Sequence, residues 1–299
     1  MASITVNRRP NAFKIVPIPE KKKIKYPALG QELLHKVFEN VNIVAPSGSG
    51  KTTWIFNVLM NCCGPRTTVL AFSNSAESDS SWDGIKEWLN ENKIRHVIDT
   101  DIIDDEKNNL IQEFIDWRVQ VAKTEKEIAK QSKLESVLAD KNVPFGGFMM
   151  QLAEEKKERP FLGTIDRCLV EKDGVTYEYP LFIVIVDDLS HRMKNPAIQT
   201  LIRMYRHMKC KLIISSQYSK DNSVGGRSNV SSILIWGGIN RTRIKELYET
   251  SGCKLTFEEF FKLYLDAVTP TPELSHPYLH VDISRRLFSK SDLYDYDLQ

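Results

Sequence analysis

Apolar and polar positions alternate in blocks along the chain, and each block predicts one element of secondary structure. Apolar and polar residues alternate over 37–44, which is typical of a strand, and 51–61 carry apolar residues at three- and four-residue steps, as in a helix. The blocks that follow predict a strand at 67–73, a helix at 83–92 and a strand at 94–98. Strands separated by helices predict βαβ units and a mainly parallel sheet flanked by helices.

A charged stretch interrupts this alternation. Between 104 and about 144, apolar residues from Leu110 to Ile128 stand at helical steps, which predicts an amphipathic helix. The pattern resumes with strands at 181–186, 211–215 and 231–236, helices at 196–208, 241–251 and 256–266, and a last strand at 278–283. We therefore expect one α/β domain over 30–299, with a helical surface insertion at about 104–180 and a C-terminal extension at about 241–299.

The composition is that of a globular protein. The 299 residues include 41 Lys+Arg and 39 Asp+Glu, and 41% of all residues are hydrophobic, which argues against wholesale disorder. Five cysteines without zinc spacing give neither a disulfide framework nor a metal cluster. The longest apolar run, 181–186, is far too short to cross a bilayer, and the basic N-terminus has no apolar leader. We expect no membrane insertion and no secretion.

Residues 1–29 differ from the rest of the chain. They hold seven Lys or Arg side chains and one acidic side chain, and Pro17, Pro19 and Pro27 interrupt the second half. An extended basic arm of this kind suits an acidic partner, and a solvated tail is an equal alternative.

The segment between the first predicted strand and the first helix has the chemistry of a phosphate-binding loop. Glycine at 48 and 50 lets backbone N–H groups turn toward phosphate oxygens, Lys51 reaches the β- and γ-phosphates, and Thr52 offers a hydroxyl to Mg²⁺. Ala45 stands where this pattern usually has glycine, and the alternative is a Gly/Ser loop followed by a chance Lys-Thr pair. The residues predicted to bind ATP are Pro46, Ser47, Gly48, Ser49, Gly50, Lys51, Thr52 and Thr53.

Two carboxylates end the apolar strand at 181–186. If that strand neighbours the loop strand, Asp187 holds Mg²⁺ together with Thr52, and Asp188 orients or deprotonates the attacking water. Gln217 ends the next strand, where its amide can contact the γ-phosphate or the water. Taken alone, turn-forming aspartates and a plain strand end explain the same residues.

In this order, the elements resemble the FtsK/HerA-type branch of P-loop ATPases. More narrowly, they are similar to the genome-packaging ATPases of poxviruses, other large DNA viruses and virophage-like elements. The matching residues are Pro-Ala-Leu at 27–29, the loop at 46–52, Asp187-Asp188, Tyr205-Arg206-His207 before Ile213 to Gln217, and Gly226-Arg227-Ser228-Asn229. The similarity covers about 27–103 and 180–240.

The resemblance implies an ATP hydrolase that moves double-stranded DNA into a viral capsid. It implies a ring of subunits, usually six, with ATP at each interface, capsid proteins as partners, and activity in the infected host cell, in the viral factory or cytoplasm, with the virion as a further location. A neighbour's arginine would enter the site. The candidates are Arg227, then Arg206 and Arg203, although surface ion pairs are the usual role of arginines. A nucleotide-dependent assembly switch and a P-loop phosphotransferase are the alternatives.

Overall fold

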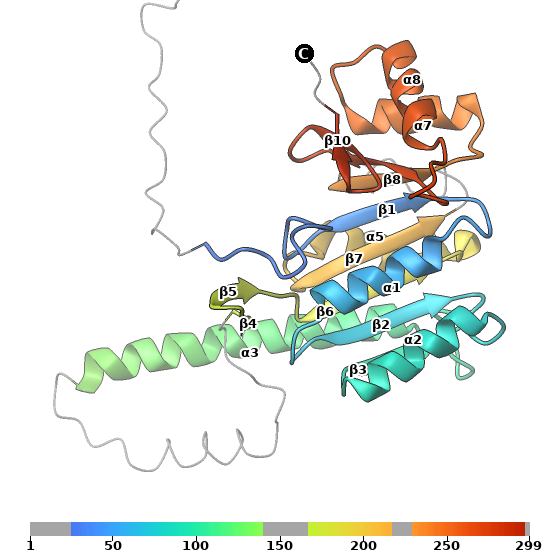
Figure 1. Ribbon diagram of the computed structural model, residues 1–299. Helices are drawn as coiled ribbons and strands as arrows, with labels where there is room; N and C mark the ends of the chain where they lie inside the picture. Colours follow the sequence, from blue (N-terminus) through green and yellow to red (C-terminus); the bar gives the residue numbers. More distant parts are fainter. Residues whose placement is uncertain (1–24, 140–166, 217–228, 297–299) are drawn as a thin grey trace, which may run out of the picture.

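The computed structural model describes residues 25–139, 167–216 and 229–296, and a nine-stranded sheet forms their centre (Figure 1). The strand order is β11-β10-β9-β8-β1-β7-β6-β2-β3. The parallel strands are β1 (Asn40–Val44), β2 (Thr68–Ser73), β3 (Arg95–Asp99), β6 (Phe182–Asp187), β7 (Cys210–Ser216) and β8 (Ser232–Trp236). The predicted α/β fold, a mainly parallel sheet of P-loop type, is confirmed.

The strand order separates the loop strand from the acidic strand. β7 lies between β1 and β6, so that Ser215 is paired with Ile43 on one side and with Asp187 on the other. The sequence analysis placed the carboxylates near the loop on the condition that the two strands are neighbours. That condition is wrong. Because all three strands are parallel, their carboxyl ends still share one edge, and the gap across β7 is about 10 Å.

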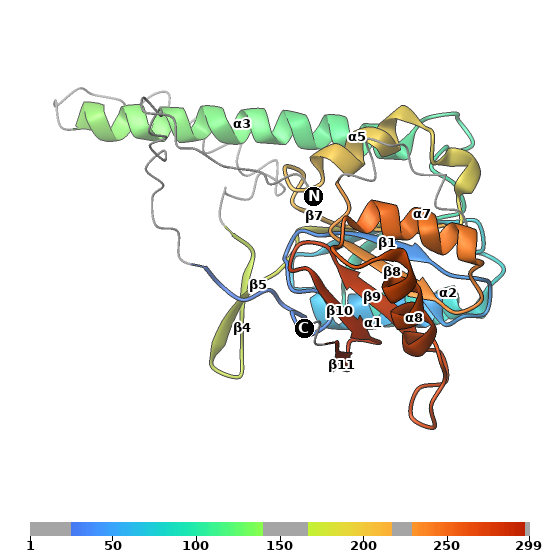
Figure 2. The ribbon, with the colours of Figure 1, turned by 90° about the horizontal axis from the view of Figure 1, so that it is seen from above.

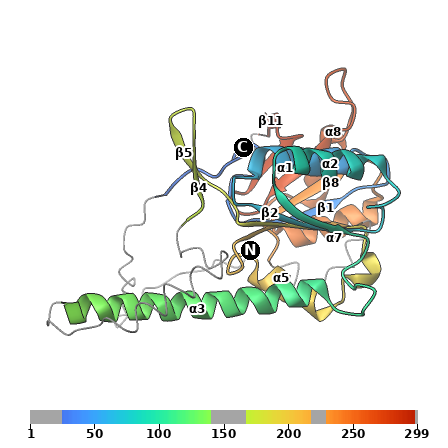
Figure 3. The same cartoon turned by 90° about the horizontal axis from the view of Figure 1, so that it is seen from below.

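Each central strand sends alternate side chains into two hydrophobic cores. On β6, Ile183 and Ile185 pack against α1 and α2, whereas Val184 and Val186 pack against α3 and α5, and all four are fully buried. Figures 1 and 3 show these helix pairs on opposite faces of the sheet. Their bounds are α1 (Lys51–Cys62), α2 (Ser80–Glu91), α3 (Leu110–Ala139) and α5 (Pro196–Met204). A parallel sheet covered on both faces explains the unbroken apolar run of β6.

The C-terminal part adds an antiparallel extension to the sheet. The helices α7 (Arg241–Ser251) and α8 (Phe257–Ala267) pack on β8 and on the added strands. These strands are β9 (Tyr278–Asp282), β10 (Leu287–Lys290) and β11 (Tyr294–Asp295). The prediction that 278–283 is the last strand is wrong. The two further strands are four and two residues long, and their turns use Arg286, Ser291 and Asp292 at positive φ in place of glycine.

The structure also differs from the prediction within the segment 104–180, which was predicted to be a helical insertion. Residues 169–178 form a hairpin, β4 (Leu169–Lys172) and β5 (Val175–Glu178), whose Asp173-Gly174 turn has positive φ at both residues. Figure 2 shows this hairpin standing off the main sheet. The Pro-Ala-Leu segment lies beside it, because Leu29 N donates to Glu178 O at 2.8 Å.

The helix α3 begins in the core and then leaves it. Ile111 and Ile115 are buried with the α5 side of the sheet, and the Phe114 ring lies 5.0 Å from that of Phe182. Farther on, the helix runs past the edge of the sheet (Figure 2). The boundaries of the insertion stay a prediction. Within the residues that the structure describes, no helix is both long and apolar enough to cross a membrane.

Burial in the sheet predicts the cost of truncating a strand residue. Val184 on β6 is 0% exposed, and Val97 on the outer strand β3 is 48% exposed. We expect Val184→Ala to lower the free energy of unfolding by roughly 2 kcal/mol, because it leaves a cavity, and Val97→Ala by less than about 0.5 kcal/mol. Urea denaturation of both variants measures the difference. Equal losses would contradict the assignment of β6 to the centre of the sheet.

Candidate nucleotide-binding site

The loop between β1 and α1 has the shape that phosphate binding requires. Ala45 ends β1 at negative φ and is 2% exposed, so its methyl group packs in the core and glycine is not needed there. Gly48 and Gly50 have φ of 73° and 89°, values that favour glycine. No described atom lies within 4 Å of the point where a Gly48 Cβ would stand. The loop therefore keeps an open concave backbone.

The amino end of α1 has no partner of its own for its first N–H groups. Four other helices begin with a side chain that accepts from the first turn: Asp79 on α2, Asn195 on α5, Asn240 on α7 and Thr256 on α8. By contrast, α1 is preceded by Gly50, which offers no side-chain cap, and its first turn has no acid. Free N–H donors at the positive end of a helix dipole suit an anion, and the donor set thus fits the phosphates of a nucleotide.

Lys51 connects this helix end to the acidic pair. Its Nζ lies 2.8 Å from Asp187 Oδ1 and 2.5 Å from Asp188 Oδ2. The Lys51 side chain is 9% exposed and that of Asp187 1%, whereas that of Asp188 is 29% exposed. The structure therefore brings together the lysine and both carboxylates that the sequence predicts. One carboxylate is buried and the other faces the solvent side.

The two carboxylates keep Lys51 charged. Burial alone would lower the pKa of Lys51, but attraction to Asp187 and Asp188 more than offsets burial, and the pKa lies above its ordinary value. As long as both carboxylates are ionised, the protonated lysine therefore contributes its full stability at pH values below the ordinary lysine value of about 10.4. That contribution is lost only as the pH rises through the higher folded value.

Asp188 is held in an unusual backbone conformation. Its φ is 53°, in the left-handed region that aspartate tolerates better than most residues, and its N–H donates to Ser215 O at 3.2 Å. Asp188 Oδ1 is buried and finds no hydrogen-bond partner among the described residues. This turn points the second carboxylate back toward Lys51 and leaves one oxygen for a ligand.

The oxygen donors at this edge fit Mg²⁺. No group of three or more His, Cys, Asp or Glu side chains suited to a metal occurs in the described parts of the chain. Mg²⁺ is often held by one or two protein oxygens, with substrate phosphates and waters completing the shell. Thr52 in the first turn of α1 and Asp187 form such a set.

Ser73 is a member of the site that the sequence analysis missed. Its Oγ donates to Asp187 Oδ2 at 3.0 Å from the end of β2, which is paired with β6. This bond fixes the second oxygen of Asp187, so that Oδ1 faces Lys51. The signal was present, because Ser73 ends a predicted strand, and polar residues at the carboxyl ends of parallel strands gather at one edge.

Other predicted residues lie elsewhere. Arg206 precedes β7 at the opposite edge of the sheet from Asp187; it donates to Tyr205 OH at 2.9 Å and stacks over that ring at 5.3 Å. Arg203 lies in the last turn of α5 and is exposed. No described contact joins either arginine to Asp187 or Asp188. Gln217 and Arg227 lie outside the described residues.

Comparison with known proteins gives similarity at the level of architecture. No protein-family model matches the chain, and no curated protein matches it. The solved structures similar to it include the genome packaging NTPase B204 of Sulfolobus turreted icosahedral virus 2 in complex with AMP. That similarity has 13% identity and a TM-score of 0.46, and it covers 88% of this chain and 100% of the other.

Two further structures are similar over most of the chain. For B204, the DNA-packaging ATPase of Sulfolobus turreted icosahedral virus, the identity is 13%, the TM-score 0.46, and the coverage 87% of this chain and 98% of that one. For EssC (ATPases 2 and 3) of Geobacillus thermodenitrificans, the identity is 12%, the TM-score 0.42, and the coverage 82% of this chain and 37% of that one.

The ion pairs predict how Lys51 and Mg²⁺ compete. Lys51→Met should lower the free energy of unfolding at pH 7 by roughly 1–3 kcal/mol, because Asp187 stays buried without its cation while Asp188 is partly screened by solvent. In thermal melts, millimolar MgCl₂ should stabilise this variant more than the native protein, in which the ammonium occupies the carboxylates. Lys86→Met, which alters a surface lysine paired with Asp83 at 3.7 Å, is the control. An equal Mg²⁺ effect on all three proteins would contradict this competition.

Proposed function

We propose that the protein hydrolyses ATP at this edge of the sheet. The observation that carries the proposal is the Lys51 ammonium, which stands between two carboxylates beside an uncapped helix end. Lys51 and the N–H groups of the loop bind the phosphates, and Thr52 and Asp187 hold Mg²⁺. When bound, the ion neutralises charge on the phosphates.

Asp188 is the general base in this proposal. Its side chain is 29% exposed and that of Asp187 is 1% exposed, so that Asp188 can accept a proton from a water on the solvent side. Ser73 positions Asp187 and takes no part in proton transfer. Lys51 leaves the carboxylates when it binds phosphate, which frees Asp188 at the moment when a base is needed. An open carboxylate of this kind favours turnover over a passive nucleotide switch.

We further propose that hydrolysis drives double-stranded DNA into a viral capsid, within the infected cell. The support is the sequence signature shared with the FtsK/HerA-type packaging branch, above all Asp187-Asp188 and the Arg-x-Asn segment at 227–229. In this proposal six subunits form a ring, DNA passes through its centre, and a capsid protein docks the ring. Arg227 of one subunit stabilises the phosphoryl group bound by the next. The basic arm at 1–29 adds contacts to phosphates.

Assays of ATP hydrolysis with and without long double-stranded DNA test both proposals, ATP hydrolysis and DNA movement. We expect DNA to raise ATP turnover, and this stimulation to fall steeply with salt, because a motor grips phosphates of any sequence. Asp188→Asn should lower turnover by about 10²–10⁴-fold with ATP binding kept, since asparagine also tolerates positive φ. Lys51→Ala should lose ATP binding. Asp173→Asn, at φ 52° in the β4–β5 turn, is the matched control and should leave turnover unchanged.

The other outcomes separate the alternatives. If ATP turnover does not change when DNA is added, and if phosphate is transferred to a small acceptor, the protein is a phosphotransferase and not a DNA motor. If the protein binds ATP but does not hydrolyse it, the protein is a nucleotide-dependent assembly switch and not a motor.

Mixing subunits tests the arginine supplied by a neighbour. Arg227→Ala subunits mixed with native subunits should lower DNA-stimulated turnover more than in proportion to their fraction, because each altered subunit disables the site of the next. Arg203→Ala, on the exposed face of α5, is the comparison variant. Simple linear dilution by Arg227→Ala would contradict an interfacial role.

A further inference from the structure

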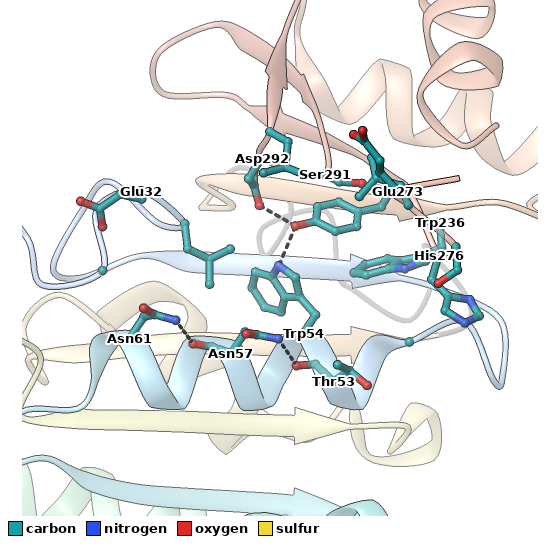
Figure 4. Close-up of a pocket in the computed structure, with 17 residues that line it drawn as sticks. Glu32, Thr53, Trp54, Asn57, Asn61, Trp236, Glu273, His276, Ser291 and Asp292 are labelled. Atoms are coloured by element: carbon teal, nitrogen blue, oxygen red, sulfur yellow. Dashed lines mark hydrogen bonds between the residues drawn. The ribbon is translucent and has the colours of Figure 1, made fainter. Parts of the chain in front are cut away.

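A cavity of about 520 Å³ lies beside the phosphate loop and has no part in the proposed chemistry (Figure 4). It runs along α1, between that helix and the C-terminal strands. We call it the α1 pocket and define it by Thr53, Asn57, Trp236, His276, Tyr278 and Asp292. Its volume is in the range of sites that hold small organic ligands.

The α1 pocket opens directly from the phosphate loop. Gly50 and Thr53, from the loop and the first turn of α1, belong to its lining. His276 closes the same end, because a Cβ on Gly50 would lie 3.3 Å from His276 Cβ. Asn57 lies one turn beyond Thr53, about 6 Å along the helix axis. A ligand with its phosphates at the loop would therefore meet this pocket with its next part.

The floor of the pocket is aromatic and almost fully paired. The Trp54 indole N–H donates to Tyr278 OH at 3.1 Å, and Tyr278 OH donates to Asp292 Oδ2 at 2.6 Å. Burial and the neighbouring Asp292 raise the pKa of Tyr278, so that its hydroxyl keeps its proton. These bonds fix the floor before any ligand binds.

Trp236 is the exception in this floor. It is 2% exposed and packs 4.5 Å from the Tyr278 ring, centroid to centroid, yet its indole N–H has no hydrogen-bond partner among the described residues. Figure 4 shows the indole nitrogen at the His276 side of the ring. A buried donor without an acceptor costs free energy, and an acceptor on a ligand would recover it.

We propose that the α1 pocket receives the base and ribose of the nucleotide, with Trp236 Nε1–H donating to an acceptor of the base. This inference rests on the proposed nucleotide binding. His276 lies against the nucleoside at the mouth, where its exposed ring offers a flat face. The pocket thus makes the site one for nucleoside triphosphates and not for bare polyphosphate.

Calorimetric titration of the full chain with ATP and, separately, with inorganic tripolyphosphate tests the proposal. Trp236→Phe keeps the aromatic packing and removes the N–H. It should lower the affinity for ATP about fivefold and leave the affinity for tripolyphosphate unchanged. Trp82→Phe is the matched control, because Trp82 also has a buried indole N–H without a partner but lies on α2. It should change neither affinity.

His276→Ala gives a second variant that does not threaten the core, since the side chain is exposed. It should lower the affinity for ATP roughly tenfold, because the stacking contact is lost. The control is His207→Ala, which alters an exposed histidine at the opposite edge of the sheet. Suppose that Lys51→Ala lowers the affinity for both ligands, while the Trp236 and His276 variants lower neither affinity or lower both equally. The pocket assignment is then overturned, and nucleotide binding at the loop stands. If Lys51→Ala weakens neither, the proposed function itself fails.

Discussion

A single lysine has to meet two carboxylates across an intervening strand, and the rest of the site depends on this contact. Lys51 begins α1 after β1, and Asp187 ends β6, with β7 between them. The contact forms only if the three strands end in register, if α1 begins directly after Gly50, and if Asp188 turns back through a positive φ. The buried core on both faces supplies that register, because a slip by one residue would exchange the side chains that are packed in the two cores.

The helix α1 has two tasks that lie on different parts of its surface. Its amino end is left without a cap and faces the loop, while one side chain of its next turn, Trp54, helps to build the floor of the α1 pocket. Its remaining buried side chains fix it to the sheet. A rigid helix therefore sets the distance between the phosphate loop and the α1 pocket, because both are built against it.

Local patterns predicted most of the fold because the central strands and the amphipathic helices carry their own periodicity. The loop, Lys51, Asp187 and Asp188 were predictable for a similar reason, since the chemistry of each stands in a short segment. What could not be predicted depends on distant pairing. The place of β7 between β1 and β6 is a property of the whole sheet, β10 and β11 are too short for periodicity, and His276 and Trp236 carry no motif. Ser73 needed only the rule that polar strand ends gather at one edge.

The contact between Gly50 and His276 joins positions that are far apart in the chain. A ribosome makes the phosphate loop long before it makes the segment that closes the α1 pocket. In a nascent chain that lacks this segment, Trp54 of α1 is thus uncovered, and one edge of β8 lacks β9. The α1 pocket is then completed late in synthesis, and until that point the growing chain exposes an apolar surface that a chaperone would bind.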